Sequence, residues 1–159
     1  MRHPVRALLL LASCLAVWAG QPETSEQPLA VIERRVWELV NRERAELGLN
    51  ALEWDDRLAA AAREHAARMA KYRFFSHSDP IRGNLSDRLK LARISWRKAA
   101  ENLYAGKGPQ DLAQAAVEGW MKSPGHRQNA LDRDLNRAGT GATRAPDGTV
   151  YLVQIYIRR

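Results

Sequence analysis

The sequence contains a single cysteine, Cys14, among its 159 residues. No disulfide can therefore form within the chain, and no Cys-His pair is available to act as a thiol nucleophile. Any folded part of the chain must be stabilised by packing alone. Its length suits one domain with a full hydrophobic core.

Several motifs that mark known chemistries are also missing. The chain has no glycine-rich phosphate loop and no nucleophile elbow. Glu64-His65 does not extend to His-Glu-x-x-His, so the zinc-protease class built on that motif has no direct support. No internal repeat is present, and no low-complexity stretch occurs outside residues 20–28.

The positive charge of the chain is spread out. The formal net charge is +7, from 25 Lys and Arg against 18 Asp and Glu, and the acids are interspersed with the bases. No basic cluster alternates with aromatic residues, as a nucleic-acid groove requires. We therefore expect a solvated Arg-rich surface and no nucleic-acid partner, with at most some attraction to an anionic wall or to lipid headgroups.

The first residues are typical of an export signal. Arg2 and Arg6 precede an apolar run over residues 7–17 that is too short to span a bilayer, and the small residues Ala19-Gly20 follow. We predict a signal peptide over residues 1–19, with cleavage after Ala19. Its removal takes away two positive charges and lowers the formal charge from +7 to +5.

An alternative processing site lies within the same segment. Leu11-Ala12-Ser13-Cys14 is similar to the lipobox of bacterial lipoproteins, which would make Cys14 the lipidated first residue of a membrane-tethered protein. The apolar run before Cys14 is very short and apolar residues continue after it, so we favour simple secretion. Either way we expect an extracytoplasmic protein, with a flexible spacer over residues 20–28 and one domain over residues 29–159.

Helical periodicity and turn residues predict the frame of this domain. Gly48 is placed to end the first helix, and Asp55 or Asp56 to begin the second, whose inner face is rich in alanine. The predicted helices cover residues 29–47, about 56–69, 84–92 and 111–121. The predicted strands cover residues 100–105, 138–143 and 149–157, the last two joined by an Asp-Gly turn. The order of elements predicts an α+β fold with a sheet between helix layers.

Three residues in different predicted elements are candidates for chemistry. His77 lies in a polar loop. His126 follows Ser123-Pro124, which predict the start of a helix. The positive end of the helix dipole lies there and disfavours the charged imidazolium form of His126. Glu101 lies among small and apolar residues in a predicted strand, where burial requires a cation, a metal or hydrogen bonds. A structural ion pair with an arginine is the alternative explanation for Glu101. Only a tertiary fold can bring the three together.

Other notable side chains are better explained by packing. His65, on the alanine-rich helix face, is expected to be a core histidine. Trp54, Trp96 and Trp120 are expected to anchor packing rather than to form a ligand platform.

The order of segments resembles the CAP superfamily of cysteine-rich secretory, antigen 5 and pathogenesis-related proteins, in its bacterial SCP-like branch without disulfides. The resemblance covers about residues 32–157. The most specific segment is Trp120-Met121-Lys122-Ser123-Pro124-Gly125-His126. The other matching segments are Asn41-Arg42-Glu43-Arg44, Leu58-Ala59 to His65-Ala66, Ser76-His77, Glu101-Asn102-Leu103, Gly139 to Gly141 and Tyr151 to Tyr156.

This resemblance implies a three-layer α-β-α sandwich with a central antiparallel sheet and a surface cleft. In the family the cleft holds two histidines and two acids, and some members bind a divalent cation there, often zinc. His77, Glu101 and His126 match three of the four positions. Ser123 stands where the second acid is usual, and Ala100 where glycine is usual, which weakens a metal site.

We therefore expect a monomeric, exported binding module whose His77, Glu101 and His126 hold a divalent cation such as Zn²⁺, a ligand, a lipid or an envelope or protein partner. Two alternatives stay open. One is a metal-assisted or acid/base hydrolase of peptide or cell-wall material, with Glu101 as general base. The other is a structural domain that the three residues only stabilise. Without a dedicated nucleophile or oxyanion donor, binding is favoured over catalysis.

Overall fold

The structure is a computed structural model that describes residues 27–108 and 111–159. The expected signal peptide, Cys14 and most of the expected spacer lie outside these residues. The described part contains five helices: α1 (Leu29–Glu46), α2 (Asp56–Tyr72), α3 (Leu85–Leu91), α4 (Leu112–Lys122) and α5 (Pro124–Ala130). It contains four strands: β1 (Glu53–Trp54), β2 (Lys98–Gly106), β3 (Arg137–Arg144) and β4 (Val150–Arg158).

The four strands form one sheet in the order β1-β3-β4-β2. β4 lies at the centre and pairs antiparallel with both β2 and β3. The sheet is not wholly antiparallel as expected, because β1 pairs parallel with β3 through Glu53 and Trp54. Two residues are too few to show the alternation that marks a strand, so β1 could not be recognised from its sequence pattern.

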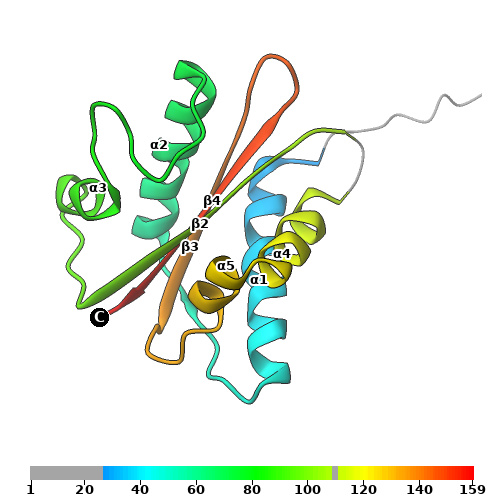
Figure 1. The fold of residues 1–159 in the computed structure, drawn as a ribbon, viewed down its shortest axis with the longest axis vertical. Helices are drawn as coiled ribbons and strands as arrows, with labels where there is room; N and C mark the ends of the chain where they lie inside the picture. The colour runs from blue at the N-terminus through cyan, green and yellow to red at the C-terminus, as the bar shows by residue number, and fades with distance from the viewer. Residues whose placement is uncertain (1–26, 109–110) are drawn as a thin grey trace, which may run out of the picture.

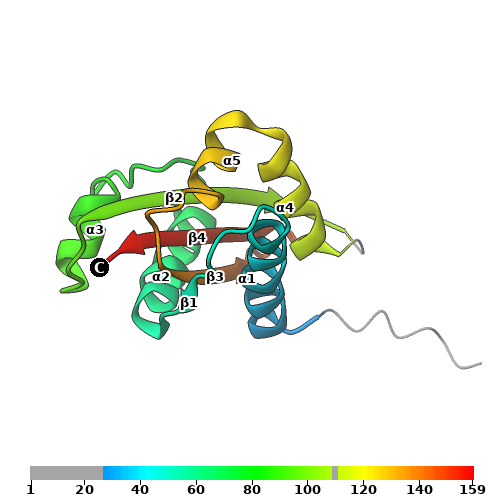
Figure 2. The same cartoon turned by 90° about the horizontal axis from the view of Figure 1, so that it is seen from below.

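Helices cover both faces of the sheet, which confirms the predicted α-β-α sandwich (Figure 1). One core lies between the sheet and α1 and α4, around Trp120 and Tyr156. The other lies between the sheet and α2 and α3, around Leu58 and Met69. Figure 2 shows β2, β4 and β3 stacked in that order, with α5 beside β2.

The predicted helix boundaries are confirmed where a capping residue sets them. Asp55 accepts hydrogen bonds from the backbone N–H groups of Arg57 and Leu58 and begins α2. Gly48, with φ +67°, follows the end of α1. None of the helices in residues 27–108 or 111–159 is both long and apolar enough to cross a bilayer.

Helix α2 lies unusually close to β3, and two glycines make this approach possible. A Cβ on Gly139 would lie 2.2 Å from the backbone nitrogen of Ala59, and one on Gly141 would lie 2.0 Å from that of Arg63. Any side chain at these positions would therefore push the helix off the sheet. The small residues over 138–143, which the sequence predicted as a strand, fix the spacing of this layer.

The sheet edge formed by β2 is covered by side chains from the neighbouring helices. Trp120 on α4 donates its indole N–H to the carbonyl of Leu103, 2.8 Å away. Asn129 on α5 donates to the carbonyl of Glu101, 3.2 Å away. Trp120 is only 1% exposed, so its predicted role as a packing anchor is confirmed.

Candidate functional site

The three candidate residues come from three different elements around β2, the edge strand of the sheet. His77 lies in the loop between α2 and α3, Glu101 in β2 and His126 in α5. The His77 side chain is 58% exposed, whereas that of Glu101 is 2% exposed. An exposed imidazole thus stands next to a buried carboxylate.

Glu101 is held between a histidine and an arginine. His77 Nδ1 lies 2.9 Å from Glu101 Oε1. Arg88, on α3, donates from Nη1 to Oε2 at 2.9 Å and from Nη2 to Oε1 at 3.0 Å. The ion pair with an arginine that was the alternative explanation for Glu101 is thus present, although the sequence did not single out Arg88 among the many arginines.

These contacts keep Glu101 ionised and set the orientation of His77. Burial raises the pKa of the Glu101 carboxyl, but the hydrogen bonds from His77 and Arg88 outweigh burial and bring the pKa below its ordinary value. An ionised carboxylate only accepts hydrogen bonds, so His77 Nδ1 carries the proton. In the neutral imidazole, His77 Nε2 therefore has the free lone pair.

The backbone around His77 is anchored on both sides of the residue. His65 Nε2 lies 2.9 Å from the carbonyl oxygen of Ser76. Arg88 Nη2 donates to the carbonyl of His77 at 3.0 Å. Further along the loop, buried Asp79 forms a two-pronged ion pair with Arg68 of α2. The loop is thus tied to the body of the domain at three points.

His126 occupies the third position of α5 and is partly buried. Its pKa is lowered from the ordinary value, first by burial and then by the charge of His77. A neutral His126 was expected, although the sequence argument assigned this to the helix terminus. Ser123 precedes α5 as predicted, but its side chain makes no capping hydrogen bond, and Pro124 begins the helix.

Two asparagines join the strand of Glu101 to the helix of His126. Asn102 donates from Nδ2 to the carbonyl of His126 at 2.9 Å. Asn129 donates to the side-chain oxygen of Asn102 at 3.0 Å. His126 therefore reaches the site through Asn102, whereas His77 and Glu101 touch directly. The sequence analysis gave neither asparagine a role, although both lie within the part of the chain that resembles the family.

An open groove of about 530 Å³ lies beside His77 and Glu101. Its wall includes Trp96 and Leu85, with Asn129 among its polar groups. Trp96 packs against the core but is only partly buried, so it contributes to the groove as well as to packing. This volume falls in the range of small-ligand sites.

The residues of the site offer two imidazoles to a metal ion. In the described part of the chain, no three His, Cys, Asp or Glu side chains are grouped so that they could hold one together. Both Glu101 oxygens already accept hydrogen bonds from Arg88, and one also faces His77. Glu101 is therefore placed to orient an imidazole ligand, as carboxylates often do next to zinc-binding histidines. His77 Nε2 and His126 remain as ligand candidates.

His65 is fully buried in the core, as expected, and should make stability depend on pH. Its pKa is lowered from the ordinary 6.5, first by burial and then by the charge of Arg88, although Glu101 and Asp79 oppose this. The unfolded chain then binds more protons than the folded one below pH 6.5. The buried His65 therefore adds its full contribution to the free energy of unfolding above pH 6.5. This contribution is lost as the pH falls from 6.5 towards the lowered pKa of His65.

We therefore expect the urea midpoint of the wild type to fall between pH 7 and pH 5, and to fall less in His65→Gln. His126 also has a lowered pKa, so His126→Gln serves as the second variant. The same pH dependence in wild type and His65→Gln would show that His65 is not the group responsible.

Residues 37–156 match the model of the family described as "CAP: Cysteine-rich secretory protein family". The chain is 36% identical over 129 residues to the Bacillus subtilis (strain 168) protein named "Uncharacterized membrane protein YlbC". That match covers 80% of this chain and 34% of the relative.

Two solved structures share the fold. An extracellular protein containing a SCP domain from Bacillus anthracis has a TM-score of 0.75 and 30% identity, with 87% of this chain and 44% of that chain covered. An outer surface protein from Borrelia burgdorferi also has a TM-score of 0.75, at 22% identity, with 84% and 96% covered. The present chain thus spans less than half of the two Bacillus proteins.

Proposed function

The chain belongs to the cysteine-rich secretory protein (CAP) family, in its bacterial SCP-like form, and from this we propose that it is an extracytoplasmic binding module. Its ligand would be held at His77, which lines the groove that includes Trp96, and at His126. The observation that carries this proposal is the buried Glu101 carboxylate, which Arg88 holds on one side and which orients the exposed His77 imidazole on the other.

The names of the relatives support a location outside the cytoplasm. YlbC is named a membrane protein, the Bacillus anthracis protein is called extracellular, and the Borrelia protein is called an outer surface protein. The predicted signal peptide over residues 1–19 agrees with such a location. Secretion remains the favoured form, and lipidation at Cys14 the alternative.

A divalent cation such as Zn²⁺ is a ligand that this chemistry can accept. His77 Nε2 and His126 would bind the ion, and Glu101 would fix the His77 ring through Nδ1. Bound zinc would supply a Lewis acid that can take donor atoms from a further ligand. Because only two side chains are available where zinc sites usually have three or four protein ligands, the affinity should be weak.

Zinc binding is tested by isothermal titration calorimetry of the wild type and of the double variant His77→Ala, His126→Ala. We expect binding heat in the wild type and none in the double variant. Gln128→Ala, an exposed position on α5, is the matched control and should bind as the wild type does. Identical heats in wild type and double variant would remove the metal from the proposal.

A hydrolase is the second candidate, and the His77–Glu101 contact favours a particular form of it. Both oxygens of Glu101 are engaged, and its lowered pKa makes it a poor general base. His77, oriented by Glu101 and exposed beside the groove, is better placed to take a proton from water. Turnover of peptide or peptidoglycan that disappears in His77→Gln would favour this candidate over a binding module.

The third possibility is that the three residues only stabilise the fold. In that case His126→Ala would lower the melting temperature, and neither Zn²⁺ nor wall fragments would shift it. A melting temperature of the wild type that rises with Zn²⁺ would argue against this possibility.

A further inference from the structure

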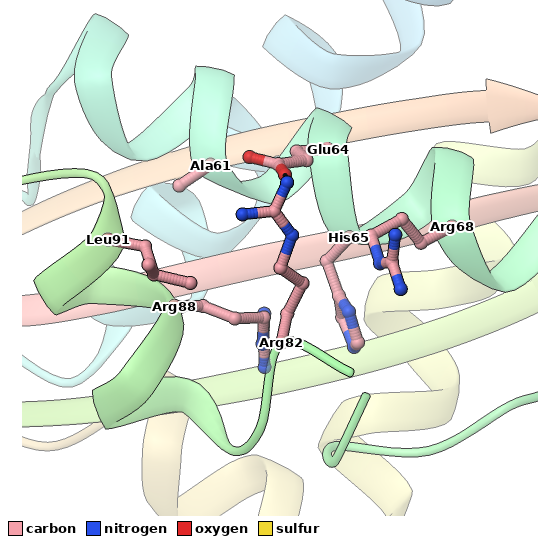
Figure 3. Close-up of a pocket in the computed structure, with 7 residues that line it drawn as sticks. All are labelled: Ala61, Glu64, His65, Arg68, Arg82, Arg88 and Leu91. Carbon is pink, nitrogen blue, oxygen red and sulfur yellow. Dashed lines mark ion pairs between the residues drawn. The ribbon is translucent and has the colours of Figure 1, made fainter. Parts of the chain in front are cut away.

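A small pocket lies behind the Arg88–Glu101 pair, between α2 and α3. It is lined by His65, Arg88, Arg68, Glu64 and Arg82, among others (Figure 3). Glu64 and Arg82 form an ion pair, 3.4 Å long, and both are about half exposed, so they lie on its solvent side. In Figure 3 the Arg82 side chain extends towards Glu64.

Two buried nitrogen atoms of the residues that line this pocket have no hydrogen-bond partner. They are His65 Nδ1 and Arg88 Nε. His65 is 0% exposed and Arg88 is 7% exposed, so bulk water does not satisfy them. A buried polar atom without a partner is unfavourable, so the surroundings of these two atoms favour a molecule that completes both hydrogen bonds.

The two atoms require opposite hydrogen-bond partners. The carbonyl of Ser76 accepts from His65 Nε2, so Nε2 carries the ring proton and Nδ1 has a free lone pair. Arg88 Nε always carries a proton. A molecule that accepts from Arg88 and donates to His65 would satisfy both, and water is the smallest molecule that can do so.

The size of the pocket restricts the ligand to water. The centre of a water-sized sphere has about 10 Å³ in which to move, which is close to the smallest space that holds one water molecule. Phosphate, acetate and larger ligands do not fit. A bare anion cannot donate to the His65 lone pair.

We propose that one water molecule bridges Arg88 Nε and His65 Nδ1, and that His65 and Arg88 together position His77. His65 holds the Ser76 carbonyl, Arg88 holds the His77 carbonyl, and Arg88 also holds the Glu101 carboxylate that orients the His77 ring. The water joins the two side chains into one buried support. The second part of this inference, the positioning of His77 for ligand binding, rests on the proposed function.

The water is tested by NMR spectroscopy of the ¹⁵N-labelled protein. We expect a long-lived water cross peak at the Arg88 Nε proton, slow exchange of that proton, and ¹⁵N shifts of His65 that show the proton on Nε2. A missing water cross peak, or a proton on His65 Nδ1, would overturn the proposal. Neither result depends on whether the protein binds zinc.

Two substitutions separate the two contacts of His65. In His65→Gln the side-chain amide can still donate to the Ser76 carbonyl, but the water loses its acceptor. In His65→Asn the side-chain amide oxygen can still accept from the water, but the contact with the Ser76 carbonyl is lost. We expect the Arg88 Nε proton to exchange about tenfold faster in His65→Gln, because a buried hydrogen bond is lost. An unchanged exchange rate in a folded His65→Gln would contradict the bridge.

The positioning role is read from the imidazole signals of His77. We expect the imidazole ¹⁵N shifts of His77 to change in His65→Asn, which loses the contact with the Ser76 carbonyl, and to change less in His65→Gln, which keeps it. A purely structural His65 would lower stability and leave the His77 signals unchanged in the folded protein. No zinc binding in the wild type, with the water cross peak still present, would remove the proposed metal ligand and keep the water site.

Discussion

Replacement of Gly141 by alanine is expected to lower the free energy of unfolding by about 3 kcal/mol, the upper end of the usual cost of overpacking. The new Cβ would lie 2.0 Å from the backbone nitrogen of Arg63 and 2.4 Å from the carbonyl carbon of Ala62. Backbone atoms cannot rotate away as a flexible side chain can. Relief therefore requires the whole of α2 to move off β3.

Gly119→Ala is the matched control for this substitution. Gly119 lies within α4, and a Cβ there would have no neighbour within 4 Å. Because alanine is the better helix former, this change should raise stability by about 0.5–1 kcal/mol. Urea unfolding with constant m-values measures both. A Gly141→Ala protein as stable as the wild type would show that α2 and β3 are not in such close contact.

Replacement of Arg88 by methionine is expected to cost about 3–5 kcal/mol, because it leaves the Glu101 charge buried without its main partner. Arg88 and Glu101 side chains are 6% and 2% exposed, so water cannot take over the lost hydrogen bonds. His77 alone then faces the carboxylate. The same substitution should disturb the His77 loop, since Arg88 also holds its carbonyl.

The double variant Arg88→Met, Glu101→Gln tests whether buried charge is the cause. It should recover most of the lost stability, because no unpaired charge remains in the core. Arg35→Ala is the control, since Arg35 and Asp111 pair at 40% and 36% exposure and such surface pairs contribute less than about 1 kcal/mol. A double variant no more stable than Arg88→Met alone would exclude this explanation.

The elements predicted best from the sequence are those with many periodically spaced apolar residues or with a strong capping residue. The inner face of α2, from Leu58 to Met69, is buried as its spacing indicated. The hairpin of β3 and β4 also forms, with Gly148 at φ +86° in the turn. In contrast, β1 is too short for any period, and its place in the sheet depends on β3, which lies far along the chain.

The site could be predicted in part, because burial of an acid is visible in the sequence but its partner is not. Glu101 lies among apolar neighbours, which indicated that a compensating group was needed. Arg88 is one of many arginines, and its helix places it against Glu101 only in the folded chain. Arg44 shows the same limit: it is fully buried and donates to the carbonyls of Ala130 and Asp132, although it lies between the charged residues Glu43 and Glu46 in α1.

The side chains that cover the β2 edge have a consequence for assembly. An edge strand with free carbonyls is a template on which a strand from another molecule can add. Trp120 and Asn129 occupy two of these acceptors, at Leu103 and Glu101. A protein with no disulfide to restrain it thus gains protection against intermolecular sheet growth from α4 and from α5, whose Asn129 also lines the groove beside His77.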